Sequence, residues 1–175
     1  MQNMEAGCYE PKKVLTIAGS DCSGGAGIQA DIKTITVHKA YAMSVITALT
    51  AQNTLGVRAI QEATPQFVAQ QMEAVFEDIT PDAVKIGMTF NSPIIMTIAL
   101  NLRRYQARNI VLDPVMIAES GGKLLQDDAR AALVQYLLPL ADMVTPNLHE
   151  AGCLCGRDLH TEEGMVWAAE KISEM

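Results

Sequence analysis

The feature that most limits the fold of this chain is an alternation of short apolar runs with amphipathic segments. The run over residues 14–18 ends at Gly19, and the run over 110–112 ends at Asp113-Pro114. Short apolar runs of this kind are typical of strands that are buried on both faces of a sheet. Between the runs, apolar residues recur at three- and four-residue intervals, which is typical of helices that bury one face. The alternation therefore predicts an α/β fold with a mainly parallel central sheet flanked by helices.

The boundaries of these elements follow from turn and capping residues. Thr64-Pro65 and Ser92-Pro93 each predict a helix start, with the hydroxyl residue as N-cap and proline in the first turn. Strands are predicted over 14–18, 45–49, 57–60, 83–86, 110–112 and 143–145, with further helices after the glycine-rich loop, over about 127–138, after Pro146 and after Thr161.

The predicted domain organisation is an N-terminal extension over 1–12 followed by one domain over 13–175. The final helix begins at Thr161, and no strand follows it to complete the crossover that an alternating α/β pattern requires. We therefore expect the chain to represent the N-terminal two-thirds of a larger domain, with a sheet that is incomplete at its C-terminus.

Composition excludes several classes of protein. A net charge of −7 argues against nucleic acid as a partner, because a duplex-binding protein needs a basic face. The longest uncharged stretch, over 40–57, contains too many hydroxyl and amide side chains for a membrane-spanning helix, and the first twelve residues lack the apolar segment of a secretory signal. The four cysteines form neither a disulfide framework nor a zinc-ligand pattern. The expected location is the cytoplasm, with no membrane partner.

A glycine-rich loop over 19–27 separates the first predicted strand from the first helix. Glycines in such a turn let backbone N–H groups approach a ligand, and the helix N-terminus after them favours an anionic or polar group. The loop lacks the Lys and Ser/Thr of a P-loop. It matches the loose dinucleotide pattern, but the acidic residue expected about 20 residues later is absent, since Glu62 is the next carboxylate after Asp31.

Polar residues at strand ends and helix starts are the remaining candidates for chemistry. Asp31 is either a solvated charge near the helix start or a ligand contact, and Gln52 follows a strand, where α/β proteins place polar ligand contacts. Asp113 either forms the turn before Pro114 or belongs to a cation site. Asn147 and Glu150 have the spacing of a capping arrangement, which the spacing favours over a role in ordering Mg²⁺ and its waters.

Six ordered segments together carry a family resemblance. They are 15–21 (LTIAGSD), 23–31 (SGGAGIQAD), 51–54 (AQNT), 85–88 (KIGM), 112–116 (LDPVM) and 145–150 (TPNLHE). In this order the segments closely resemble the hydroxymethylpyrimidine/phosphomethylpyrimidine kinases of thiamine biosynthesis. That family has the three-layer ribokinase-like fold. The resemblance extends from about residue 13 to the end of the chain.

The resemblance implies ATP-dependent phosphorylation of 4-amino-5-hydroxymethyl-2-methylpyrimidine and then of its monophosphate, with ATP as co-substrate, Mg²⁺ as cofactor and a homodimeric assembly. By analogy with the family, the pyrimidine pocket comprises Gly19, Asp31, Gln52, Met88 and Val115. Asn147 would contact phosphate, and Glu150 and, more weakly, Asp113 would hold the metal.

One departure from the family pattern is large. The family carries a glycine-rich anion hole, and the residue that activates the acceptor hydroxyl, in its C-terminal third. No Gly-Thr-Gly or Gly-Ala-Gly segment follows Asn147 here. We therefore expect this chain to carry the pyrimidine pocket and part of the Mg²⁺ site, to lack the catalytic residues, and to be inactive by itself. The alternatives are a pyridoxal kinase of the same fold, which Gln52 argues against, and a non-catalytic pyrimidine-binding module.

Overall fold

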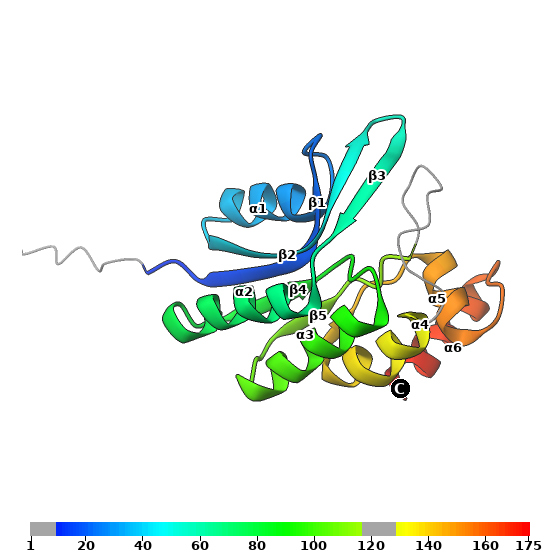
Figure 1. The fold of residues 1–175 in the computed structure, drawn as a ribbon. Helices are drawn as coiled ribbons and strands as arrows, with labels where there is room; N and C mark the ends of the chain where they lie inside the picture. The colour runs from blue at the N-terminus through cyan, green and yellow to red at the C-terminus, as the bar shows by residue number, and fades with distance from the viewer. Residues whose placement is uncertain (1–9, 117–128) are drawn as a thin grey trace, which may run out of the picture.

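The apolar runs form the strands of one sheet in the computed structural model, which describes residues 10–116 and 129–175 (Figure 1). Strands are β1 (Lys13–Asp21), β2 (Tyr41–Asn53), β3 (Gly56–Glu62), β4 (Ala83–Ile86), β5 (Ile110–Leu112) and β6 (Met143–Val144). Helices are α1 (Gly27–Val37), α2 (Pro65–Asp78), α3 (Ser92–Arg104), α4 (Ala129–Ala132), α5 (Leu148–Cys155) and α6 (Glu162–Ser173). The start of the helix predicted over 127–138, most of the N-terminal extension and Cys8 lie outside the described residues.

The sheet has six strands in the order β3-β2-β1-β4-β5-β6. Neighbouring strands are parallel except for β2 and β3, which form an antiparallel hairpin. The chain adds β2 and β3 on one side of β1 and then returns to add β4 on the other side. Because α/β proteins bind ligands outside the carboxyl ends of strands at such a reversal, the ends of β1 and β4 mark the expected site.

The two faces of the sheet are covered differently. Ile17 of β1, Ile86 of β4 and Leu112 of β5 are fully buried in the main core, which also contains residues of α2, α3 and α4. The alternate residues point to the other face, where α1 packs on β1 and β2 (Figure 1). On that face Lys85 of β4 and Val111 of β5 are only partly buried. Within the described ranges, no helix is long and apolar enough to cross a membrane.

The predicted helix starts at residues 64 and 161 are confirmed, and the predicted cap at residue 92 is wrong. Thr64 and Thr161 each accept a hydrogen bond from a backbone N–H of the first turn. At α3 the N-cap is Asn91, whose side chain accepts a hydrogen bond of 3.0 Å from the backbone of Ile94. An asparagine one residue earlier offers the same acceptor, so Ser92 becomes the first helical residue.

Five elements differ in extent from their predictions, and two of them, β1 and β3, simply extend beyond both predicted ends. β2 has 13 residues, because its polar residues pair with β3 or β1 in the ladder rather than ending the strand. α4 continues as one π-helical turn over Leu133–Leu137 and a 3₁₀ turn over Leu138–Leu140. Pro139 has no N–H to donate, so a regular α-helix cannot continue through it. The last strand ends at Val144, one residue earlier than predicted.

Candidate functional site

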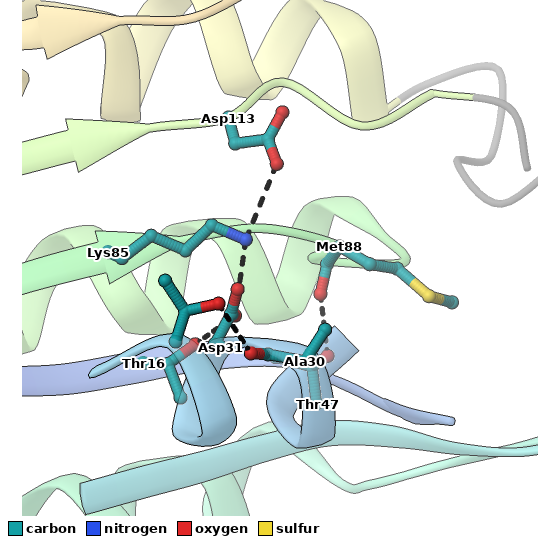
Figure 2. A network of polar contacts seen from close by, with 8 residues as sticks. Thr16, Ala30, Asp31, Thr47, Lys85, Met88 and Asp113 are labelled. Atoms are coloured by element: carbon teal, nitrogen blue, oxygen red, sulfur yellow. Dashed lines mark hydrogen bonds and ion pairs between the residues drawn. The ribbon is translucent and has the colours of Figure 1, made fainter. Parts of the chain in front are cut away.

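Gly19 and Met88 meet where the strand order reverses. A Cβ atom on Gly19 would lie 2.8 Å from the Met88 sulfur, so the thioether rests directly on the glycine backbone. The Met88 carbonyl accepts a 2.7 Å hydrogen bond from the buried hydroxyl of Thr47, which fixes the start of the loop after β4 (Figure 2). The Met88 side chain belongs to a small apolar cluster, separate from the main core, that also contains Ala48, Val57, Ile60, Phe90 and Val115.

The glycine-rich loop is organised around its own carboxylate. Asp21, which is 3% exposed, accepts hydrogen bonds from the backbone of Ser23, Gly25 and Ala26 and from the Ser23 hydroxyl. Burial raises the pKa of Asp21, but the hydrogen bonds from Ser23, Ala26 and Gly25 outweigh it, and the net pKa is lowered. The expectation that this loop offers its N–H groups to a ligand therefore needs correction, because Asp21 already occupies three of them.

Asp31 lies in the second turn of α1, and it is not a solvated charge. Its Oδ2 atom accepts a 2.6 Å hydrogen bond from the Thr16 hydroxyl and lies 3.2 Å from the Lys85 ammonium (Figure 2). The same ammonium lies 3.3 Å from Oδ2 of Asp113, directly after β5. Lys85 therefore joins the carboxylate of α1 to the carboxylate at the end of β5.

Gln52 lies at the end of β2, beside the glycine-rich loop. Its backbone N–H and carbonyl both bond the Cys22 sulfur, and its side-chain oxygen lies 3.3 Å from the Thr50 hydroxyl. The pairing of β2 with β3 is irregular between Ala51 and Gln52. Such irregularities change the direction of a side chain and are over-represented next to active sites.

Asn147 and Glu150 form the capping box that their spacing favoured. The Glu150 carboxylate accepts a hydrogen bond from the Asn147 backbone, and the Asn147 side chain accepts one from the Glu150 backbone, both at 2.9 Å. Glu150 is only 5% exposed. Burial raises the pKa of Glu150 and the Asp113 charge raises it further, with partial compensation from the backbone N–H groups of Asn147 and Met116.

Asp113 and Glu150 fit a magnesium ion. Within residues 10–116 and 129–175, no three His, Cys, Asp or Glu side chains form a potential metal cluster. Mg²⁺ does not need such a cluster, because it is commonly held by one or two carboxylates together with water and substrate phosphates. Glu150 is a buried carboxylate that faces a second carboxylate, and a divalent cation would relieve that repulsion.

The structure thus places the residues predicted from the sequence near the end of the sheet where the parallel strands have their carboxyl ends. Met88 and Val115 belong to one apolar cluster that lies against Gly19, and Lys85 joins Asp31 to Asp113. Gln52 lies at the end of β2 beside the glycine-rich loop, and Asn147 and Glu150 begin α5 after β6.

Sequence reasoning missed Thr16, Asp21 and Lys85 as parts of this edge. Lys85 carried a usable signal, because a lysine between Val84 and Ile86 interrupts an otherwise apolar strand. Such a residue must point away from the core and needs a partner for its charge. Asp21 carried a weaker signal, as the acidic residue of the glycine-rich loop.

The strand order, the helices on both faces and the polar residues where the strand order reverses define a ribokinase-like α/β fold. Solved structures agree with this class. Phosphomethylpyrimidine kinase from Clostridium difficile 630 is 50% identical with a TM-score of 0.87, over 93% of this chain and 71% of that one. Pyridoxal kinase from Staphylococcus aureus, solved with AMP-PCP and pyridoxal, is 38% identical with a TM-score of 0.83, over 95% and 60%.

Sequence comparison identifies the family within this class. The profile described as phosphomethylpyrimidine kinase matches residues 21–175. The hydroxymethylpyrimidine/phosphomethylpyrimidine kinase of Escherichia coli (strain K12) is 53% identical over 92% of this chain. The chain belongs to the phosphomethylpyrimidine kinase family. It spans 61% of the length of the Escherichia coli relative.

Proposed function

We propose that this chain supplies the pyrimidine-binding half of an ATP-dependent kinase. The reaction is phosphorylation of the hydroxymethyl group of 4-amino-5-hydroxymethyl-2-methylpyrimidine and then of the resulting monophosphate, in thiamine biosynthesis. The observation that carries the proposal is the pairing of an apolar wall, Met88 resting on Gly19, with polar groups along the same sheet edge. An aminopyrimidine fits such a site because the faces of its flat ring pack on apolar side chains and its amino group and ring nitrogens form hydrogen bonds with polar ones.

The residues have distinct roles in this proposal. Met88 and Val115 form apolar walls for the pyrimidine ring, and Gly19 leaves room for it because it has no side chain. Asp31 accepts a hydrogen bond from the exocyclic amino group, and the Gln52 amide bonds the ring edge. A carboxylate is a suitable partner for an amino group because it only accepts hydrogen bonds when ionised.

The phosphate end of the substrate lies toward α5 in this proposal. Asn147 contacts phosphate, and Glu150 and Asp113 hold Mg²⁺ directly or through water. The metal would neutralise charge on the phosphates of ATP during transfer. Among the chain's own residues, the capping box fixes the Glu150 carboxylate, so its direction does not depend on the ligand.

Calorimetric binding of the aminopyrimidine alcohol and of pyridoxal to this chain tests the proposal. We expect the pyrimidine to bind at least about tenfold more tightly, a difference of about 1.4 kcal/mol. Asp31→Asn should reduce pyrimidine affinity by a similar factor. The pyridoxal kinases that share this fold are the relevant alternative. Tighter binding of pyridoxal, or no binding of the pyrimidine, would contradict the proposal.

The assembly and location remain proposals that accompany this function. A cytoplasmic homodimer is proposed from the family resemblance, with an extension over 1–12 and one kinase domain over 13–175. Leu49 and Leu55 on the β2–β3 hairpin are 52% and 86% exposed, and such apolar side chains favour association. Light scattering after size-exclusion chromatography measures the mass of the assembly, and a monomer at micromolar concentration would contradict the dimer.

A further inference from the structure

Lys85 is a charged residue within the otherwise apolar strand β4. It lies in β4 between Val84 and Ile86, which are 1% and 0% exposed, and its side chain emerges on the opposite face of the sheet. Thr16 is its register partner on β1, so both side chains point to the face that carries α1. The strand thus delivers a single positive charge to the face where Asp31 and Asp113 lie (Figure 2).

The contacts of Asp31 leave one of its oxygens for a ligand. Oδ2 receives both the Thr16 hydroxyl at 2.6 Å and the Lys85 ammonium at 3.2 Å. Among the described residues, none donates a hydrogen bond to Oδ1 of Asp31. Two donors from two different strands on one oxygen fix the rotation of the carboxylate, so the direction of Oδ1 is fixed as well.

Gly87 provides the space that this arrangement requires. A Cβ atom on Gly87 would lie 2.9 Å from the Lys85 nitrogen and 3.2 Å from the Cβ of Ala18. Any larger residue would therefore displace the ammonium from its position between the carboxylates. The chain places its smallest residue two positions after Lys85, and the ammonium occupies that space.

The second contact of Lys85 holds the ammonium itself. Asp113 follows the last residue of β5, and its backbone N–H bonds the carbonyl of Ile86, which anchors it to β4. The Asp113 side chain draws the ammonium from the opposite side to Asp31, so the lysine lies between two fixed carboxylates. At distances near 3.3 Å and partial burial these are charge-assisted contacts rather than remote attractions.

We propose that Lys85 is a positioning residue for substrate selection: it fixes the Asp31 carboxylate so that its free oxygen accepts the exocyclic amino group of the aminopyrimidine. This inference rests on the proposed function, because it assigns to Asp31 a contact with that amino group. Lys85 itself does not touch the substrate. Its removal leaves the Thr16 hydroxyl to hold the Asp31 carboxylate without the second donor, and it leaves Asp31 and Asp113 without the cation between them.

The test measures a ratio of affinities by calorimetry. The probes are 4-amino-5-hydroxymethyl-2-methylpyrimidine and the analogue that lacks the 4-amino group. For the wild-type chain we expect a preference of about tenfold or more for the amino compound. Lys85→Met should reduce the preference to about twofold or less, while the affinity for the analogue stays within about twofold of wild type. A loss of folded protein would weaken both probes equally and leave the ratio unchanged.

Two further variants separate positioning from a general loss of charge. Lys85→Arg keeps the positive charge, although the guanidinium is larger than the ammonium, and it should retain more of the preference than Lys85→Met. Lys39→Met removes the same charge at an exposed position after α1 and should leave both affinities unchanged. Restoration by arginine together with an inert Lys39 variant supports the positioning role.

The outcomes distinguish this inference from the proposed function. If the wild-type chain prefers the amino compound and Lys85→Met keeps the same ratio, with the affinity for the analogue within about twofold of wild type, Lys85 has no positioning role although the pyrimidine site stands. If the wild-type chain binds the pyrimidine without any preference for the amino group, the role given to Asp31 is wrong and the inference about Lys85 is wrong with it. If neither pyrimidine binds, both the proposed function and this inference are rejected.

Discussion

Asp21 and Glu150 are both almost fully buried carboxylates near helix starts, yet their pKa values move in opposite directions. Burial acts on both. Asp21 receives four hydrogen bonds from the glycine-rich loop, which outweigh the burial and lower its pKa. Glu150 faces the charge of Asp113 and receives less compensation, so its pKa is raised. The Asp21 carboxylate is therefore fully hydrogen-bonded within the glycine-rich loop, whereas Glu150 and Asp113 place negative charge where a cation could bind.

The largest expected loss of stability comes from adding a side chain at Gly27, in the glycine-rich loop around Asp21. Gly27 has a φ of +55°, and a Cβ atom there would collide with the carbonyl oxygen of Gly19. Gly27→Ala should lower the free energy of unfolding by about 3–4 kcal/mol, combining the cost of a left-handed alanine with that of overpacking. Urea unfolding measures the change.

Gly156 is the matched control for Gly27. It caps α5 with a φ of +68°, but nothing lies within 4 Å of an added Cβ atom. Gly156→Ala should cost only about 1 kcal/mol, the conformational part alone. Equal losses at Gly27 and Gly156 would show that the glycine-rich loop is no more tightly packed than an open helix end.

The next largest loss of stability is expected when the Asp21 carboxylate is replaced. Asp21→Asn should lower the free energy of unfolding by about 2–3 kcal/mol at pH 7, because an amide replaces a charged acceptor of four hydrogen bonds. Asp78→Asn, at an exposed position, should change it by less than about 0.5 kcal/mol.

The pH dependence of the Asp21 variant has a defined sign. The folded pKa of Asp21 lies below its usual value of 3.8, so its stabilising contribution is present above that value and is lost as the pH falls through the folded pKa. Unfolding measured from pH 7 down to pH 3 should show the difference between wild type and Asp21→Asn shrinking at the acid end. A difference that stays constant over this range would contradict the hydrogen-bonded anion.

A smaller and opposite effect is expected at Glu150. Its folded pKa lies above the usual 4.5, so its favourable contribution is present below 4.5 and is lost as the pH rises through the folded pKa. Glu150→Gln keeps an oxygen that reaches the Asn147 backbone and removes the buried charge. We expect it to be about 1 kcal/mol more stable than wild type at pH 8 and less so at pH 5.

The response of the melting temperature to Mg²⁺ should also differ between variants of Glu150 and Asp21. Millimolar Mg²⁺ should raise the melting temperature of the wild-type chain at pH 8 and leave that of Glu150→Gln unchanged, because a ligand stabilises only the state that binds it. Asp21→Asn should respond to Mg²⁺ like wild type. If Mg²⁺ raised the melting temperatures of all three proteins equally, Glu150 would not be a ligand of the metal.

The smallest effect on stability is expected at Gly19. An added Cβ atom would lie 2.8 Å from the Met88 sulfur, and this flexible side chain can move aside at a cost of about 0.5–1 kcal/mol. The displaced thioether then occupies the proposed ring position, so Gly19→Ala should weaken pyrimidine binding about tenfold. Gly25→Ala, whose Cβ would be 3.7 Å from Asp21, is the control with normal binding. Equal binding by both variants would place the ring away from Met88.

Much of the fold was predictable because strand and helix periodicity depends on local sequence. The strands over 83–86 and 110–112 have their predicted bounds, and Thr64 and Thr161 cap the predicted helices. Local patterns do not resolve competition between neighbouring candidates, and Asn91 therefore replaced Ser92 as a cap. The site was predictable only as separate motifs, since spacing does not reveal which side chains meet.

The fold class, the strand-end positions of Gln52 and Asp113 and the capping box of Asn147 and Glu150 were predictable from the sequence, because each depends on residues that are close in the chain. The position of Lys85 between Asp31 and Asp113 could not be predicted in this way, because Asp31 lies 54 residues before Lys85 and Asp113 lies 28 residues after it. The same holds for Met88 on Gly19. These contacts arise from strand register and the reversal of strand order at β1, which bring distant segments to one edge.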